Sequence, residues 1–204
     1  MVDTIIFDIG SVLVDWNYRT FLDKIFKSED ARNAVRKCLF ENPMYAEFDR
    51  GVLEEEEVLR KCISLEPKYE KEIRFAFKHI GKCVVQRDFV KSWILDLKSR
   101  GYRVIYLSNY SHNCLKQNKK QLDFLSLMDG GIFSCYAKMA KPDLKIYKLM
   151  IDKFNLIPEN CVFIDDKNDN IVAGEKCGIE GILYMNYEQA VESLEQTLRN
   201  KNGG

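Results

Sequence analysis

A short apolar run near the N-terminus ends in a single carboxylate. The residues Ile5-Ile6-Phe7 precede Asp8, and Gly10 follows two positions later. An apolar run of this length predicts a buried β-strand, and a glycine lets the backbone turn sharply after it. Open α/β sheets bind their ligands at the carboxyl ends of their strands. We therefore expect an α/β fold in which Asp8 lies at the functional edge of the sheet.

Further strand-like segments alternate with helical patterns along the chain. The strand candidates are residues 4–8, 103–108, a weaker one at 131–134, 161–165 and 181–184. Between them, apolar residues recur at intervals of three and four, which is typical of amphipathic helices. The clearest series are Val90, Trp93, Ile94 and Leu97, then Ile146, Leu149, Met150 and Phe154, and then Val191, Leu194 and Leu198. This alternation predicts a parallel sheet covered by helices on both faces.

Residues 16–85 break this alternation. They contain no convincing strand but several segments with helical periodicity, such as 21–26 and 58–63. The acidic run 54–57 suits the first turn of a helix, where the helix dipole favours negative charge. We expect residues 16–85 to form an inserted helical cap over the strand end that carries Asp8. Residues 1–15 and 86–204 would then form the core domain.

Composition excludes several classes of protein. Lysine and arginine number 31, as do aspartate and glutamate, so the basic excess of a typical nucleic-acid binder is missing. No apolar run approaches the ~18 residues needed to span a bilayer, and no basic region precedes Asp8 as in a signal peptide. The seven cysteines are scattered without a C-x-x-C pair, which favours reduced thiols. We expect a cytoplasmic protein with neither nucleic-acid nor membrane partners, and the sequence carries no signal of its oligomeric state.

Polar groups follow the later strands and could join Asp8. Ser108 ends the strand at 103–108, and the pair Asp165-Asp166 ends the strand at 161–165. Two adjacent carboxylates repel each other unless a cation lies between them, so the pair predicts metal binding. Mg²⁺ prefers oxygen ligands of this kind. Lys141 is the expected cationic partner of Asp8, with Lys138 as a competitor for that role.

In this order, the segments resemble the four motifs of the haloacid dehalogenase superfamily, whose members include phosphohydrolases. The matching residues are Phe7-Asp8-Ile9-Gly10-Ser11-Val12, Leu107-Ser108-Asn109, Lys141-Pro142-Asp143 and Ile164-Asp165-Asp166. Residues 47–51, followed by Glu55-Glu56, resemble the cap of the subgroup that contains sugar-phosphate phosphatases and 2-haloacid dehalogenases. The resemblance covers essentially the whole chain. It implies a Rossmann-like three-layer core with strand order 5-4-1-2-3, plus the cap.

The resemblance also implies a role for each motif residue. Asp8 would attack phosphorus and form an aspartyl-phosphate, and Lys141 would orient Asp8 and stabilise the transition state. The phosphate would be bound by Ser108, Asn109 and Lys141. Mg²⁺ would be held by the carboxylates of Asp8, Asp165 and Asp166 and by the carbonyl of Gly10.

Five other residues receive weaker interpretations. Asp169 and Asn170 are expected to support the metal ligands or to begin a helix, and His112 is expected to be a surface residue at a helix start. Trp16 and Tyr45 either line the cap interface or belong to the core, and the sequence leaves both alternatives open.

Gly10 departs from the pattern of most phosphatases of this superfamily, which carry a second aspartate there as general acid and base. Losing such a group costs on the order of 10²–10⁴ in rate. The start Asp-x-Gly-Ser-Val nevertheless resembles phosphatases that act on glucose 1-phosphate. We expect a Mg²⁺-dependent phosphatase of a small phosphorylated metabolite, most simply a sugar phosphate. The alternatives are a metal-independent 2-haloacid dehalogenase and a catalytically silent interaction protein.

Overall fold

The computed structural model describes residues 1–203 and contains a parallel five-stranded sheet. Its spatial order is β5-β4-β1-β6-β7. The strands are β1 (Thr4–Phe7), β4 (Arg103–Ser108), β5 (Gly130–Phe133), β6 (Cys161–Asp165) and β7 (Glu180–Leu183). When these five strands alone are numbered along the chain, the order from the β7 edge is 5-4-1-2-3, as the resemblance implied. The predicted α/β class is confirmed, and each strand lies within one residue of its expected position.

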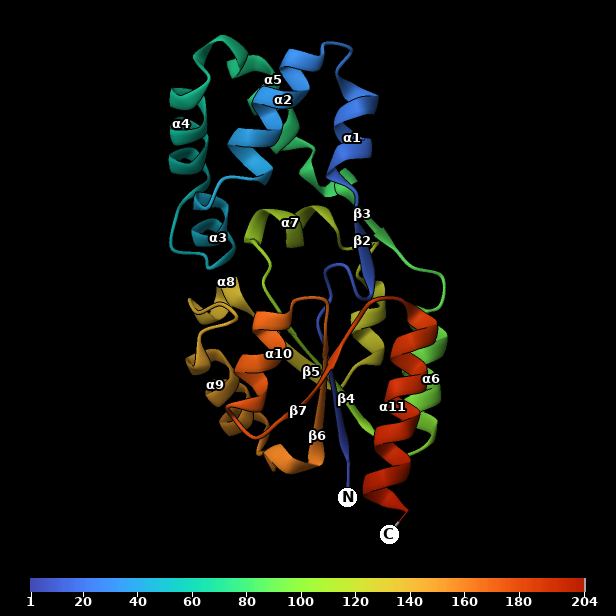
Figure 1. Ribbon diagram of the computed structural model, residues 1–204. Helices are drawn as coiled ribbons and strands as arrows, with labels where there is room; N and C mark the ends of the chain where they lie inside the picture. The colour runs from blue at the N-terminus through green and yellow to red at the C-terminus, as the bar shows by residue number, and fades with distance from the viewer. Residues whose placement is uncertain (204) are drawn as a thin grey trace.

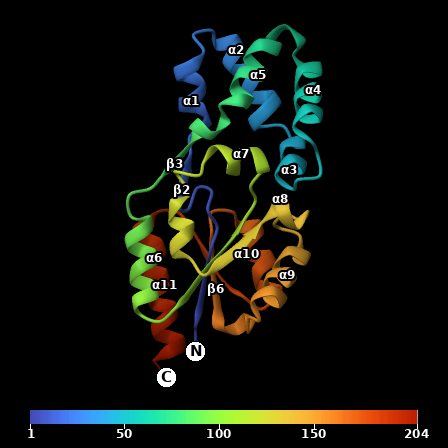
Figure 2. The ribbon, with the colours of Figure 1, turned by 180° about the vertical axis from the view of Figure 1, so that it is seen from behind.

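Helices cover both faces of the sheet, which makes the core a three-layer structure (Figure 1). The helices α6 (Val90–Ser99) and α11 (Tyr187–Asn202) lie on one face, and α9 (Leu144–Phe154) and α10 (Asn168–Glu175) lie on the other, as the view from behind also shows (Figure 2). The three predicted helical patterns, in α6, α9 and α11, pack their buried apolar residues against the sheet. Strands β1 and β6 are buried along their whole length. Phe7 packs edge-on against Trp93 of α6, and Phe163 packs edge-on against Tyr147 of α9.

A helical insert, defined here as residues 17–83, stands beyond the carboxyl ends of the strands (Figure 1). Its elements are α1 (Tyr18–Ile25), α2 (Glu29–Val35), a π-helical turn (Arg36–Phe40), α3 (Met44–Asp49), α4 (Glu55–Leu65), a 3₁₀ turn (Pro67–Tyr69), α5 (Glu70–Lys78) and a second 3₁₀ turn (Ile80–Cys83). Apolar side chains of the insert and of the α6 face of the core belong to one continuous buried cluster. Packing therefore couples the insert to the core.

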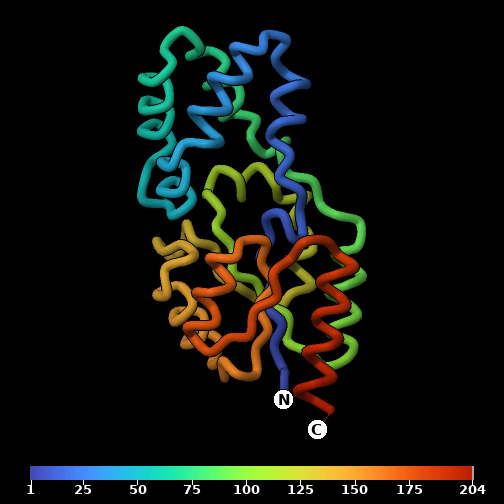
Figure 3. Tube along the Cα trace, in the orientation of Figure 1, coloured from blue at the N-terminus to red at the C-terminus, as the bar shows by residue number. Residues whose placement is uncertain are grey.

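Two short strands join the insert to the core, and the expectation that residues 16–85 contain no strand was wrong at both ends. The strands β2 (Val14–Trp16) and β3 (Val84–Gln86) pair in antiparallel fashion. The chain enters and leaves the insert along this ribbon, where the two connections run side by side (Figure 3). Three residues are too few to produce the alternating pattern by which a strand is recognised in a sequence.

The remaining short elements lie at the edges of the core. They are α7 (His112–Gln117), a 3₁₀ turn (Asp123–Leu127), α8 (Ser134–Ala137) and a 3₁₀ turn (Pro158–Asn160). His112 is exposed at the start of α7, as expected. Among residues 1–203, no helix combines the length and the apolar character that crossing a bilayer requires.

Candidate active site

Asp8 follows β1 directly and lies at the carboxyl edge of the sheet. Its backbone N–H donates to the carbonyl of Ile164 at 2.9 Å, which extends the ladder between β1 and β6 by one residue. The Oδ1 atom accepts a hydrogen bond from the N–H of Ile9 at 2.7 Å. The residue is 7% exposed. The strand therefore delivers a largely buried carboxylate to the edge, as its sequence predicted.

Lys141 bridges Asp8 and Asp165. Its Nζ atom lies 2.9 Å from Oδ1 of Asp8 and 2.6 Å from Oδ2 of Asp165. Burial alone would lower the pKa of Lys141, but the two carboxylates outweigh it, so the pKa of this group is raised and the ammonium keeps its proton. The competitor Lys138 instead donates to the carbonyl of Gly51. The geometry thus separates the two lysines that the sequence left in competition.

Asp165 ends β6, is fully buried and is surrounded by N–H donors. Besides Lys141, it accepts hydrogen bonds from Nδ2 of Asn170 at 2.9 and 3.0 Å and from the N–H of Lys167 at 2.8 Å. These bonds occupy most of the lone pairs of a carboxylate. Asn170 lies in the first turn of α10, as does Asp169. Asp165 therefore fixes Lys141, while Asp8 and Asp166 present the freer oxygen atoms.

The donor chemistry of this cluster fits Mg²⁺. Asp8, Asp165 and Asp166 can present carboxylate oxygens within 4.8 Å of one another. Burial raises the pKa of Asp8 to about 6, with the charge of Asp165 adding to the shift and Lys141 opposing it. Burial, followed by the charge of Asp165, also raises the pKa of Asp166. One ammonium thus faces three crowded carboxylates, and a hard divalent cation would relieve the remaining repulsion.

Ser108 and Asn109 end β4 beside this cluster. The hydroxyl of Ser108 is buried and has no hydrogen-bond partner among residues 1–203, so it is free to bind a ligand. The side chain of Asn109 is engaged instead: its Nδ2 donates to the carbonyl of Lys141, and its Oδ1 accepts from the N–H of Lys141, both at 2.9 Å. The side chain of Asn109 therefore holds the backbone of Lys141 in place. The backbone N–H of Asn109 remains the group that is predicted to donate a hydrogen bond to phosphate.

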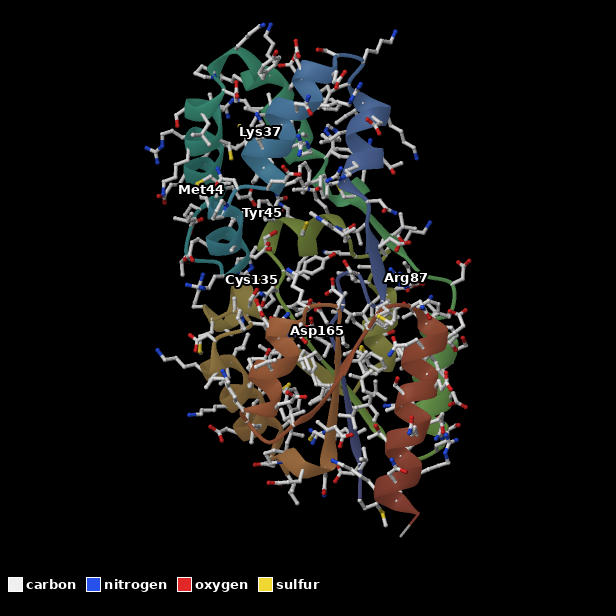
Figure 4. The ribbon with its side chains drawn as sticks, viewed as in Figure 1. Lys37, Met44, Tyr45, Arg87, Cys135 and Asp165 are labelled. Atoms are coloured by element: carbon white, nitrogen blue, oxygen red, sulfur yellow. The ribbon has the colours of Figure 1, made fainter. Side chains whose placement is uncertain are left out.

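A cavity of about 390 Å³ opens above these residues, between the sheet edge and the insert. Its core side is polar and includes Asp8, Gly10, Lys141 and Asp166. Its other side is formed largely by apolar and aromatic residues of β2 and the insert: Val14, Trp16, Phe40, Pro43, Tyr45 and Ala46. Figure 4 shows Tyr45 on the insert side, above Asp165 of the core. Trp16 and Tyr45 both line the cavity and also pack against the buried apolar cluster, so the two alternatives that the sequence left open apply together.

Gly10 lines the cavity and has room for a side chain. A Cβ atom built on it meets no atom within 4 Å, and its φ lies outside the left-handed region. The absence of a carboxylate at this position is therefore not imposed by local crowding.

Asp49 lines the same cavity from the insert, and the sequence analysis assigned it no role. It is the last residue of α3. Burial raises its pKa to about 7, and the nearby charge of Lys167 opposes that shift only in part. The one signal in the sequence was its place in residues 47–51, which resemble a cap segment. That likeness says nothing of where the side chain points.

The chain matches the model of the haloacid dehalogenase-like hydrolase family over residues 2–178. It belongs to that family. It is 25% identical to the sesquiterpene phosphatase of Aspergillus oryzae over 87% of each chain. It is 23% identical to a phosphorylated carbohydrates phosphatase of Thermotoga maritima, over 89% of this chain and 84% of that one. Two further curated relatives are longer, and the chain spans 36% and 33% of their lengths.

The fold of this haloacid dehalogenase-like hydrolase is shared by solved structures. One is a family member from Bacteroides thetaiotaomicron in complex with magnesium and inorganic phosphate, with a TM-score of 0.66 and 20% identity over 90% of this chain and 94% of that one. The predicted membership of the superfamily and the prediction of a hydrolase are confirmed.

Proposed function

We propose that the protein is a Mg²⁺-dependent phosphatase that hydrolyses a small phosphate monoester through a phosphoenzyme on Asp8. The observation that carries this proposal is the buried bridge of Lys141 between Asp8 and Asp165, with Asp166 beside it. Burying charges costs several kcal/mol for each ion, and even close pairing need not offset that cost in full. An arrangement this expensive has no purpose in a silent scaffold.

The metal would be held by Asp8, Asp166, the carbonyl of Gly10 and, where its hydrogen bonds allow, Asp165. When bound, Mg²⁺ would neutralise charge on the phosphate and on the acidic cluster. The crowding of three carboxylates around one lysine supports this assignment.

Lys141 and the N–H of Ile9 both contact Oδ1 of Asp8, which supports Oδ2 as the atom that would attack phosphorus. Lys141 keeps its positive charge near the phosphate oxygens, where negative charge builds up in the transition state. The unpartnered hydroxyl of Ser108 supports its assignment as a phosphate ligand, together with the backbone N–H of Asn109.

We further propose that residues 16–85 act as a cap domain that selects the substrate, on a core made of residues 1–15 and 86–204. The cavity volume of about 390 Å³ lies within the ordinary range for small-molecule sites. Trp16, Phe40 and Tyr45 offer flat apolar surfaces against which a sugar ring can pack. Sugar phosphates are therefore the first candidates, and a phosphorylated carbohydrates phosphatase among the relatives supports them.

The proposal is tested by phosphate release from about 100 phosphorylated metabolites, with Mg²⁺ and with excess EDTA. Activity should vanish on chelation and return with Mg²⁺. A 2-haloacid dehalogenase would need no cation, so turnover that persists in EDTA would reject the proposal. Absence of turnover across the panel would favour the silent interaction protein.

A further inference from the structure

The core side of the cavity offers no free proton donor for the departing alcohol. Gly10 has no side chain, Lys141 is bound to two carboxylates, and Asp166 belongs to the proposed metal site. Among residues 1–203, no histidine lines the cavity. A primary alkoxide is a poor leaving group, so its departure without a proton is slow. Another side chain of the cavity must therefore supply one.

Four other titratable groups of the cavity stay in one protonation state near neutral pH. Glu41 pairs with Nη1 of Arg36 at 2.6 Å, and this partner lowers the pKa of Glu41, so it stays ionised. Burial raises the pKa values of Tyr45, Tyr110 and Cys114, so these three keep their protons. Asp49 is the remaining carboxyl group on the side of the cavity opposite Asp8.

The backbone that carries Asp49 is fastened to the core. Its carbonyl accepts a hydrogen bond from Oγ of Ser134 at 2.5 Å, and that Oγ accepts one from the N–H of Tyr110 at 2.9 Å. Two residues on, Gly51 adopts a φ of +71°, and a Cβ there would come within 2.5 Å of the carbonyl oxygen of Cys135. The C-terminal end of α3 is thus docked directly on α8, so Asp49 has a fixed position over the cavity.

The groups around Asp49 leave its carboxyl group without a strong ion pair. Lys167 supplies the nearby positive charge, but its own side chain is exposed and screened by water. The titratable groups that lie close enough to be affected by the charge of Asp49 come from α3, the β4–α7 loop, α7 and α8. They are Tyr45, Tyr110, Cys114 and Cys135. None of these is cationic. Both protonation states of Asp49 are therefore accessible near neutral pH.

We propose that Asp49 is the general acid and base of this site, in place of the carboxylate missing at Gly10. This inference rests on the proposed phosphatase function. In-line attack by Asp8 places the leaving oxygen on the far side of phosphorus, which is the side of the cavity formed by the insert. A carboxyl group on that side therefore lies on the leaving-group side of phosphorus, where it can donate a proton to the leaving oxygen.

The two steps balance with water as the only co-reactant. In the first, Oδ of Asp8 forms a bond to phosphorus, the bond from phosphorus to the leaving oxygen breaks, and Asp49 gives its proton to that oxygen. In the second, the Asp49 carboxylate takes a proton from water as the water oxygen bonds to phosphorus. The bond from Asp8 to phosphorus breaks, and hydrogen phosphate leaves. Asp49 is protonated again, as at the start.

The test is Asp49→Asn, which keeps the size of the side chain but cannot exchange the proton. We expect kcat/KM for primary alkyl phosphates to fall about 10²–10³-fold. For p-nitrophenyl phosphate, whose leaving group needs no proton, kcat/KM should change less than about threefold. Because the second step also loses its base, this substrate should give a burst of p-nitrophenol followed by slow turnover.

The matched control is Asp30→Asn, which removes an exposed carboxylate from α2 of the same insert and should leave both substrates unaffected. Acid quenching during turnover, which traps any phosphorylated Asp8, tests the role of Asp49 separately from the proposed phosphatase function. If Asp8 is phosphorylated but Asp49→Asn slows both substrates equally or neither, the role of Asp49 is wrong. If Asp8 is never phosphorylated, the proposed function itself is wrong.

Discussion

The two sides of the cavity handle charge in opposite ways. On the core side, Lys141 lies within 2.9 Å of a carboxylate oxygen of both Asp8 and Asp165, and these charges are buried and fixed. On the insert side, the carboxyl group of Asp49 is buried without a close ion-pair partner. The hydroxyl of Tyr45 is buried without a hydrogen-bond partner among residues 1–203. The first arrangement suits a nucleophile that must stay ionised and aligned. The second suits a group that gives up a proton and takes it back.

The largest effect is expected from Lys141→Met, which removes the ammonium group that bridges Asp8 and Asp165 on the core side. The substitution leaves Asp8 and Asp165 facing each other without their cation, which should cost about 3–5 kcal/mol of unfolding free energy at pH 7. The deficit should shrink at pH 5, because protonation relieves the repulsion. Phosphatase activity should fall to background. Urea unfolding at both pH values measures the effect, with the exposed Lys145→Met as control. An equal cost at both pH values would contradict this account of the bridge.

A second change adds a carboxylate to the core side of the cavity. Gly10→Asp should raise kcat/KM for primary alkyl phosphates about tenfold, because the new Cβ meets no atom within 4 Å and its carboxyl group can supply a proton. Gly10→Ala is the steric control and should bring no gain. In the Asp49→Asn background the gain from Gly10→Asp should be larger still, because there is then no competing acid. A gain from Gly10→Ala would show that the effect is steric.

The smallest effect concerns stability on the insert side. The folded pKa of Asp49, about 7, lies above the ordinary aspartate value of 3.8, so folding favours the neutral form. The resulting stability is fully present below about pH 3.8 and is lost progressively as pH rises from there to about 7. Asp49→Asn should therefore stabilise the protein by about 1 kcal/mol more at pH 8 than at pH 5, which is about 2–4 °C in Tm. Thermal unfolding at the two pH values measures this difference, and a variant less stable at pH 8 would contradict it.

The core side could be predicted from the sequence because its groups lie at strand ends. Asp8, Ser108 and Asp165 each follow an apolar run, and parallel strands bring such ends to one edge. The role of Lys141 could be predicted only from the family resemblance, because nothing in its own segment indicates that its side chain is buried. The side-chain role of Asn109 could not be predicted, because it depends on a loop 32 residues away.

The insert side could not be predicted for a different reason. The place of Asp49 depends on how the end of α3 docks on α8, through the contacts of Ser134 with the Asp49 carbonyl and of Gly51 with Cys135. Helical periodicity indicates which face of a helix is apolar but not which distant surface it meets. The strands β2 and β3 escaped notice because three residues carry no period.

The most direct test of the central claim is to trap the phosphoenzyme. The wild-type protein, turning over a ³²P-labelled substrate with Mg²⁺, is quenched in acid, digested and mapped by mass spectrometry. We predict one phosphorylated peptide that contains Asp8, and none in Asp8→Asn, which should fold but not turn over. Phosphate found on Ser108, or steady turnover by Asp8→Asn, would contradict the account.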